Sequence, residues 1–276
     1  GLAHSGEVIS SYTWRAVQRE SVPTLLAYLS RAARQRQPSR FTADIVSACN
    51  VLDSAAVTQW ARTDVRRMDP VSRLETLMTL ANVRSRSGAE ALAGALQLIA
   101  SAADGFENVK NPINTHPDLT LILEQQSTDD LVRLASYLPP LTAIPIVRAQ
   151  VCSAGVTLLK RSLVDRSVLY PMVEAILAQP VNIRRETRAH SLPLAARNDL
   201  IAELRFMGMF KGDQACERRI RMHITSRDED IALAAIESSL GGEPILAEEI
   251  IMRCATDPLL RARVMMLMTT EEMYAM

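Results

Sequence analysis

The sequence predicts an all-α fold, an irregular α-solenoid of roughly fourteen helices stacked as antiparallel pairs. The chain of 276 residues is 48% hydrophobic and 4% aromatic with only 10 Gly, so small and aliphatic side chains must fill its interior. No stretch alternates apolar and polar residues over more than a few positions, as a half-buried strand would. Helix-start signals recur about every 12–25 residues, so pairs repeat at the period of helix-hairpin repeats.

Within the first hundred residues, short polar side chains precede each apolar stretch, where they accept hydrogen bonds from free helical N–H groups. The dipeptide Asp69-Pro70 is the clearest signal, because proline at the first helical position loses nothing by lacking an N–H. These signals predict helices over 24–34, 43–52 and 54–67, from 70 onward, and over 91–103; they are Ser21, Thr42, Asp53, Asp69, and Ser87 with Glu90 as a capping box.

The second part of the chain continues the pattern, and Asp257-Pro258 repeats the Asp-Pro signal: "TDPLLRARVMM" echoes "MDPVSRLETLM". Ser127 with Asp130 and Ser226 with Glu229 read as further capping sequences. The predicted helices cover 118–126, 131–138, 143–160, 167–179, 193–210, 213–224, 230–240 and 245–255, with a last one from 258 onward.

One long irregular stretch, "ADGFENVKNPINTHPD", separates the helices into two groups. It predicts basic helical repeats over 1–103, a loop over 104–117, and helical repeats with an acidic end over 118–276. Residues 1–86 carry 12 basic and 7 acidic groups, whereas 228–276 carry 3 and 10. A single compact all-α domain is the competing architecture.

The residue patterns do not favour catalysis or a cofactor. Phosphate-binding glycine loops, nucleophile motifs and histidine pairs at ligand spacing are all lacking, so we expect no enzyme activity, no cofactor and no metal site. An all-α enzyme whose site is assembled from distant residues remains the minor alternative. The scattered cysteines read as small buried apolar residues in a reducing compartment: Cys49, Cys152, Cys216 and Cys254.

Arginines gather near predicted helix ends, and these clusters are the candidate binding residues. In a stacked array such ends line one edge, where guanidinium groups can follow a phosphate backbone. The candidates are Arg31, Arg34, Arg36, Arg40, Arg62, Arg66, Arg67, Arg184, Arg185, Arg188, Arg218, Arg219 and Arg221. Capping of helix C-termini is the competing role for each cluster. Trp60, within the basic part, reads as a core residue rather than a platform for stacked bases.

The segments "FTADIVSACNVLDSAAVTQW" and "STDDLVRLASYL" resemble organellar helical-repeat proteins, the group around pentatricopeptide-like and RAP-associated repeats. In that group a polar S/T-x-x-D/E-L helix entry is followed by small and aliphatic residues. The resemblance implies binding of mitochondrial RNA, or scaffolding of RNA-processing and ribosome-assembly complexes.

We therefore expect a non-enzymatic scaffold in a ribonucleoprotein or RNA-processing assembly, with arginine clusters contacting RNA phosphates. The expected partners are protein subunits of a larger complex and RNA, with no membrane and no small-molecule substrate. The mitochondrial matrix is the expected compartment and the cytoplasm the alternative; the opening "GLAHSGEVIS" shows no secretory signal. A purely protein-binding adaptor similar to HEAT or armadillo proteins is the alternative function.

Overall fold

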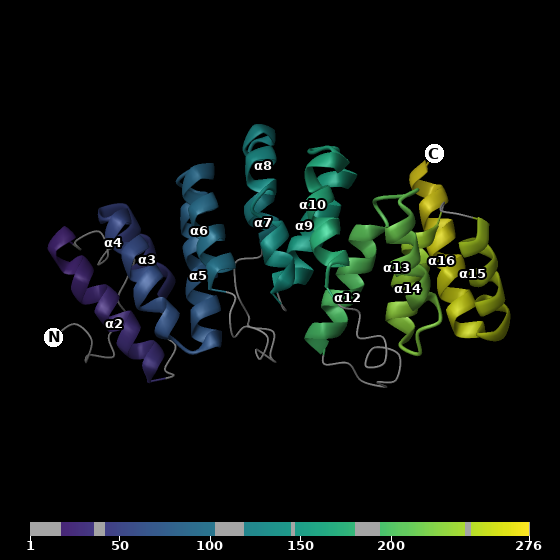
Figure 1. Cartoon of the computed structure of the whole chain (residues 1–276), viewed down its shortest axis with the longest axis horizontal. Helices are drawn as coiled ribbons and strands as arrows, with labels where there is room; N and C mark the ends of the chain where they lie inside the picture. Colours follow the sequence, from purple (N-terminus) through teal and green to yellow (C-terminus); the bar gives the residue numbers. More distant parts are fainter. Residues whose placement is uncertain are drawn as a thin grey trace. The chain divides into compact units, whose positions relative to one another are not determined.

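The computed structural model describes residues 18–35, 42–102, 119–144, 147–179, 194–240 and 244–275. All regular structure in these ranges is helical, with fourteen α-helices, three 3₁₀-helices and no strand. The predicted all-α class and the expected number of helices are therefore confirmed. Figure 1 labels the α-helices along the chain.

The chain divides into two compact units. Unit 1 contains η1 (Arg19–Ser21), α2 (Val22–Arg34), α3 (Thr42–Leu52), α4 (Ser54–Thr63), η2 (Val65–Arg67), α5 (Pro70–Ser85) and α6 (Ala89–Ser101). Unit 2 contains α7 (Leu119–Glu124), α8 (Thr128–Ala135), η4 (Pro139–Ala143), α9 (Val147–Lys160), α10 (Arg166–Leu177), α12 (Leu194–Met207), α13 (Gln214–Ile224), α14 (Glu229–Ser239), α15 (Pro244–Thr256) and α16 (Pro258–Ala275). The predicted loop over 104–117 lies outside the described residues.

In unit 1, α3 is the central helix, packing against α2, α4 and α5, while α5 also packs against α6. Helix α2 shows how the sequence directs this packing. Its buried residues, Val22, Leu26, Leu29 and Ser30, recur at helical spacing and form one stripe. Trp60 is only 5% exposed, and its indole N–H donates to Ser30 Oγ at 2.8 Å. The prediction that Trp60 belongs to the core is therefore confirmed.

In unit 2, the helices pack in two alternating series. Helix α9 packs against α7 and α12, α12 packs against α14, and α14 packs against α16. In the second series, α10 contacts α8 and α13, and α13 contacts α15. Within each series, a helix therefore packs against the next α-helix but one along the chain, and not only against the helix that directly follows it.

Two glycines permit close approach within the first of these series. A β-carbon at Gly155 of α9 would lie 2.6 Å from a ring carbon of Phe206 on α12. A β-carbon at Gly208, just after α12, would lie 2.8 Å from Cα and 2.9 Å from the carbonyl oxygen of Ser238 on α14. These distances are below van der Waals contact, so the helix spacing depends on both residues being glycine.

The two Asp-Pro signals begin helices as predicted. Asp69 Oδ1 accepts from the backbone N–H groups of Val71 and Ser72 at the start of α5, and Asp257 Oδ1 accepts from Leu260 N at 3.0 Å in α16. Three further predicted starts also cap their helices through side-chain oxygens: Asp53 on α4, Ser127 on α8 and Asp213 on α13.

Three predicted caps were wrong. Ser21 precedes α2, but its side chain forms no cap hydrogen bond with the first turn of that helix. Helix α6 begins after Gly88, which supplies no side-chain cap, so Ser87 and Glu90 do not form the predicted capping box. At α14 the cap is Asp228, which accepts from two backbone N–H groups, whereas Ser226 Oγ instead accepts from Asp228 N. A carboxylate two residues later displaced the serine because it lies next to the free N–H groups and favours the positive helix end.

Two predicted helices are shortened because a 3₁₀-helix takes part of the predicted stretch, and α8 and α12 also end three residues earlier than predicted. The stretch predicted over 54–67 is α4, which ends at Thr63, followed by the separate 3₁₀ turn η2. The helix predicted over 143–160 begins at Val147, and Ala143 instead belongs to the preceding 3₁₀-helix η4. Arg66 and Arg67 therefore lie on the 3₁₀-helix η2 and not on the last turn of α4.

Candidate functional site

The helix-end arginines of unit 1 are exposed and lie on elements that pack together. Helix α4 contacts both α2 and η2. Arg34 Nη2 lies 3.9 Å from Asp64 Oδ1, so the C-terminal ends of α2 and α4 are adjacent. We call this group the helix-end arginines: Arg31 and Arg34 of α2, Arg62 of α4, and Arg66 and Arg67 of η2.

The helix-end arginines differ in how far the protein itself already uses them. Arg66 donates to the carbonyl oxygen of Ser101 at 3.3 Å, which caps the C-terminus of α6. Arg34 has Asp64 as its counter-charge. Arg31, Arg62 and Arg67 make no hydrogen bond or ion pair with any other residue that the structure describes. The capping role therefore accounts for Arg66, but it leaves three guanidinium groups facing solvent.

A cavity of about 520 Å³ lies between α2 and α4 beside these cations. Arg31, Arg34 and Asp64 form part of its rim, and Trp60 lines it. Because Trp60 is almost fully buried, its ring face is not offered to a base. The chemistry of this surface is therefore that of guanidinium groups, which bind phosphate oxygens well.

One buried arginine near this surface was not singled out from the sequence. Arg84 of α5 is 5% exposed and donates to Asn50 Oδ1 of α3 at 3.3 Å and to Thr58 Oγ1 of α4 at 2.6 Å. Burial, and secondarily the positive charge of Arg62, lower the pKa of Arg84. Arg84 thus ties three helices of unit 1 together instead of serving as a surface contact.

In unit 2 the predicted arginines have different environments. Arg218 is exposed on α13. Arg221 is half-buried, with Nε 3.4 Å from Glu249 Oε2 of α15. Arg219 is 7% exposed and faces the interior, which corrects its placement among the surface contacts. The remaining candidates lie outside the described residues: Arg36, Arg40, Arg184, Arg185 and Arg188.

Arg219 belongs to a buried ionic cluster. Its Nε and Nη2 donate to Glu203 Oε1 of α12 at 3.0 and 2.7 Å, and Arg148 Nη1 of α9 lies 3.7 Å from Glu203 Oε2. Nearby, burial and then the charge of Arg219 lower the pKa of His223 to about 4. The cluster joins α9, α12 and α13 within the core, where Arg219 has no access to an external phosphate.

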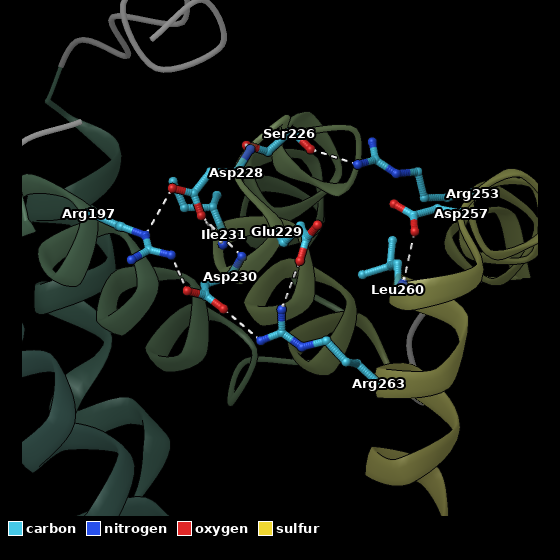
Figure 2. A network of polar contacts seen from close by, with 10 residues as sticks. All are labelled: Arg197, Ser226, Asp228, Glu229, Asp230, Ile231, Arg253, Asp257, Leu260 and Arg263. Atoms are coloured by element: carbon cyan, nitrogen blue, oxygen red, sulfur yellow. Dashed lines mark hydrogen bonds and ion pairs between the residues drawn. The ribbon is translucent and has the colours of Figure 1, made fainter. Parts of the chain in front are cut away.

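A second polar network surrounds the first turn of α14 (Figure 2). Arg197 of α12 and Arg263 of α16 approach Asp230 from two sides, and Arg197 Nε also lies 2.9 Å from Asp228 Oδ2. Arg263 donates to Asp230 Oδ1 at 2.6 Å. The hydrogen bond from Arg263, with the charge of Arg197, lowers the pKa of Asp230. These contacts join three helices of one series.

A pocket lined by cations opens in unit 2 where α9 and α12 end and α10 begins. Its volume is about 280 Å³. Four cations line it, although no local pattern groups them in the sequence: Lys160, Arg166, Arg205 and Lys211. The carboxylate in the lining, Glu237, accepts from Arg205 Nε at 3.1 Å. We call this the cationic pocket.

The cysteines follow the sequence interpretation for the most part. Cys49, Cys152 and Cys216 are buried and Cys254 is half-buried, all as free thiols. Burial raises the pKa of Cys49 to about 11 and that of Cys216 to about 12, the latter with the negative charge of Asp213 as a further cause. These thiols are therefore protonated at neutral pH and poor nucleophiles.

None of the helices in the described ranges is both long enough and apolar enough to cross a lipid bilayer. In the same ranges, no three or more His, Cys, Asp or Glu residues form a group that could hold a metal ion. Comparison with protein-family models, with curated proteins and with solved structures gives no match for this chain. Function is therefore inferred from the residues and their geometry.

Proposed function

We propose that the helices stack as an irregular α-solenoid of antiparallel pairs. Several contacts between helices are separated by 30–35 residues in the sequence. Arg197 and Asp230 are 33 residues apart, and so are Asp230 and Arg263, so two successive contacts of the series α12, α14 and α16 have the same separation. This separation matches the period of about 33–47 residues found in helix-hairpin repeats.

Unit 1 has a similar spacing. Arg84 and Asn50 are 34 residues apart, and Trp60 and Ser30 are 30 apart, each pair joining two helices by a buried side-chain hydrogen bond. In a solenoid each repeat buries its apolar face mainly against its neighbours, so contacts recur at the repeat length. The alternating packing series of unit 2 support the same architecture.

On this architecture the proposed function is a non-enzymatic scaffold in a ribonucleoprotein or RNA-processing assembly, located in the mitochondrial matrix. Its partners are protein subunits of that assembly and RNA. The observation that carries the RNA role is the exposure of Arg31, Arg62 and Arg67 on packed elements of unit 1, without partners among the described residues. Guanidinium groups arranged in this way contact the phosphate backbone rather than base edges.

The test is a salt titration of single-stranded RNA binding, followed by fluorescence anisotropy. For single strands, the slope of log affinity against log salt changes by about 0.7 for each phosphate contact. The triple variant Arg31→Gln/Arg62→Gln/Arg67→Gln is therefore expected to reduce the slope by about 2 and to weaken binding at low salt.

A matched control removes the same charge from exposed positions in unit 2. The variant Arg133→Gln/Arg227→Gln/Arg261→Gln has the same net charge as the unit 1 variant and is expected to retain the wild-type slope. The RNA role is refuted if the wild-type protein does not bind RNA at low salt, or if the two variants lose affinity equally.

A protein-binding adaptor without an RNA role is the second candidate, and an apolar surface on α15 and α16 favours it. Five large apolar side chains are exposed there by 62–71%: Ile251, Met252, Leu259, Met265 and Met266. Exposed apolar side chains on two helices that pack together are typical of protein contacts, and methionine suits adaptable ones. If the protein is such an adaptor, its partner proteins should still co-purify with it after nuclease treatment and after loss of the unit 1 arginines. They should not co-purify with an Ile251→Glu/Met266→Glu variant.

A further inference from the structure

We propose that the cationic pocket of unit 2 binds a terminal phosphate group, a phosphomonoester or pyrophosphate carrying about two or more negative charges. The ligand is either a small phosphorylated molecule or the phosphorylated end of an RNA strand. This site is separate from the helix-end arginines, and in its RNA form it rests on the proposed function.

The charge of the pocket indicates a multiply charged anion. Lys160, Arg166, Arg205 and Lys211 contribute four cations, against which the lining supplies one carboxylate, Glu237. A phosphodiester carries a single negative charge, whereas a phosphomonoester carries about 1.5–2 near neutral pH. The surplus of positive charge is therefore better matched by a terminal phosphate than by a backbone phosphate passing over the surface.

The cations are available to a ligand. Lys160, Arg166 and Lys211 are exposed, and among the described residues they have no hydrogen-bond or ion-pair partner. Only Arg205 is engaged, through Glu237. If these lysines only capped helices, Lys160 and Lys211 would donate hydrogen bonds to the last carbonyl groups of α9 and α12. No such hydrogen bond is present within the described residues. Mutual repulsion of four cations around one cavity is relieved when an anion enters.

The shape of the pocket limits the size of its occupant. Gly208 and Ser238 are buried members of the lining, and a β-carbon at Gly208 would lie 2.8 Å from Cα of Ser238, so the chain after α12 lies close to α14 there. The volume of about 280 Å³ lies just below the usual range of ligand sites, about 300–1,000 Å³. A cavity of this volume suits a compact group such as a terminal phosphate.

Isothermal titration calorimetry of the full chain with inorganic pyrophosphate at low salt tests the site. We expect saturable binding with one ligand per chain. The Lys160→Gln/Lys211→Gln variant is expected to raise Kd about tenfold or more, because each position loses a charge-assisted contact. The control Arg133→Gln/Arg227→Gln removes two cations of the same unit outside the pocket and is expected to leave Kd within about twofold of wild type.

Circular dichroism and thermal melts of both variants establish that they are folded. The site is refuted if pyrophosphate binding does not saturate, if the pocket variant binds as tightly as wild type, or if the control loses as much affinity. The Arg31→Gln/Arg62→Gln/Arg67→Gln variant should still bind pyrophosphate. Failure of the proposed RNA role and failure of the pocket are thereby distinguished.

Two RNA oligomers of one sequence, with a 5′-phosphate or a 5′-hydroxyl, identify the source of the phosphate. If RNA supplies it, wild type prefers the 5′-phosphorylated oligomer and the pocket variant loses that preference. If the natural ligand is a small molecule, pyrophosphate binds through the pocket while the two oligomers bind equally.

Discussion

Replacing Glu203 by glutamine is expected to lower the free energy of unfolding by about 3–5 kcal/mol, because Arg219 is then buried without its counter-charge. The side chains of Glu203 and Arg219 are 2% and 8% exposed, so water cannot solvate the guanidinium that remains. Glu203 accepts two hydrogen bonds from Arg219 and also faces Arg148. Two charged hydrogen bonds at about 1.5–3 kcal/mol each would sum to about 3–6 kcal/mol, which overlaps this range.

Urea denaturation followed by circular dichroism measures this loss, and an exposed ion pair between α12 and α14 supplies the control. Arg205 and Glu237 are 3.1 Å apart, with side chains 51% and 27% exposed. Glu237→Gln should cost less than about 1 kcal/mol, and added salt should reduce that cost further. The reasoning fails if Glu203→Gln costs no more than Glu237→Gln. Adding Arg219→Gln to Glu203→Gln should recover part of the loss, because the unpaired charge is then removed.

Gly208→Ala should destabilise by about 1–3 kcal/mol, since its β-carbon would press on the backbone of α14. A β-carbon at Gly94 would have its nearest neighbour, a side-chain atom, at 3.7 Å, so Gly94→Ala should instead stabilise α6 by about 0.5–1 kcal/mol. The urea midpoints of the two glycine variants should therefore move in opposite directions from that of wild type. Asp69→Ala should cost about 1 kcal/mol as a lost N-cap and Asp69→Asn much less, and equal losses would refute the capping role. The pKa of His223, lowered to about 4, means that the unfolded chain binds more protons below about pH 6.5. The free energy of unfolding is thus fully present above that pH and is about 1.4 kcal/mol lower at pH 5.5. In a His223→Gln variant this decrease between neutral pH and pH 5.5 should be absent, which urea denaturation at the two pH values would measure.

The sequence predicted most of the helices because their signals are local. A cap such as Asp69 acts on N–H groups two and three residues ahead, and a stripe such as that of α2 needs only helical spacing. The sequence failed where two local signals compete. Both Ser226 and Asp228 are competent caps, and the placement of the helix start decides between them.

The candidate site was predictable only in part. Arg31, Arg62 and Arg67 could be singled out as cations near helix ends, and their exposure agrees with that interpretation. Arg219 could not be separated from its exposed neighbour Arg218, because only packing against α12 gives it the buried partner Glu203. Adjacent residues on a helix point about 100° apart, so a run of cations is divided between surface and core.

The sequence by itself determined an all-helical chain with most of its helix starts, the basic character of its first part, and the burial of three of its four cysteines. These properties depend on residues within a few turns of one another. Only the tertiary structure decided which charges meet: Lys160, Arg166, Arg205 and Lys211 gather around one cavity, while Glu203 is enclosed by Arg148 and Arg219. The reason is that helix packing joins residues distant in the chain, such as Arg219 and Glu203, 16 positions apart, or Ala149 and Asp199, 50 apart. The crossing geometry sets the contacts between them.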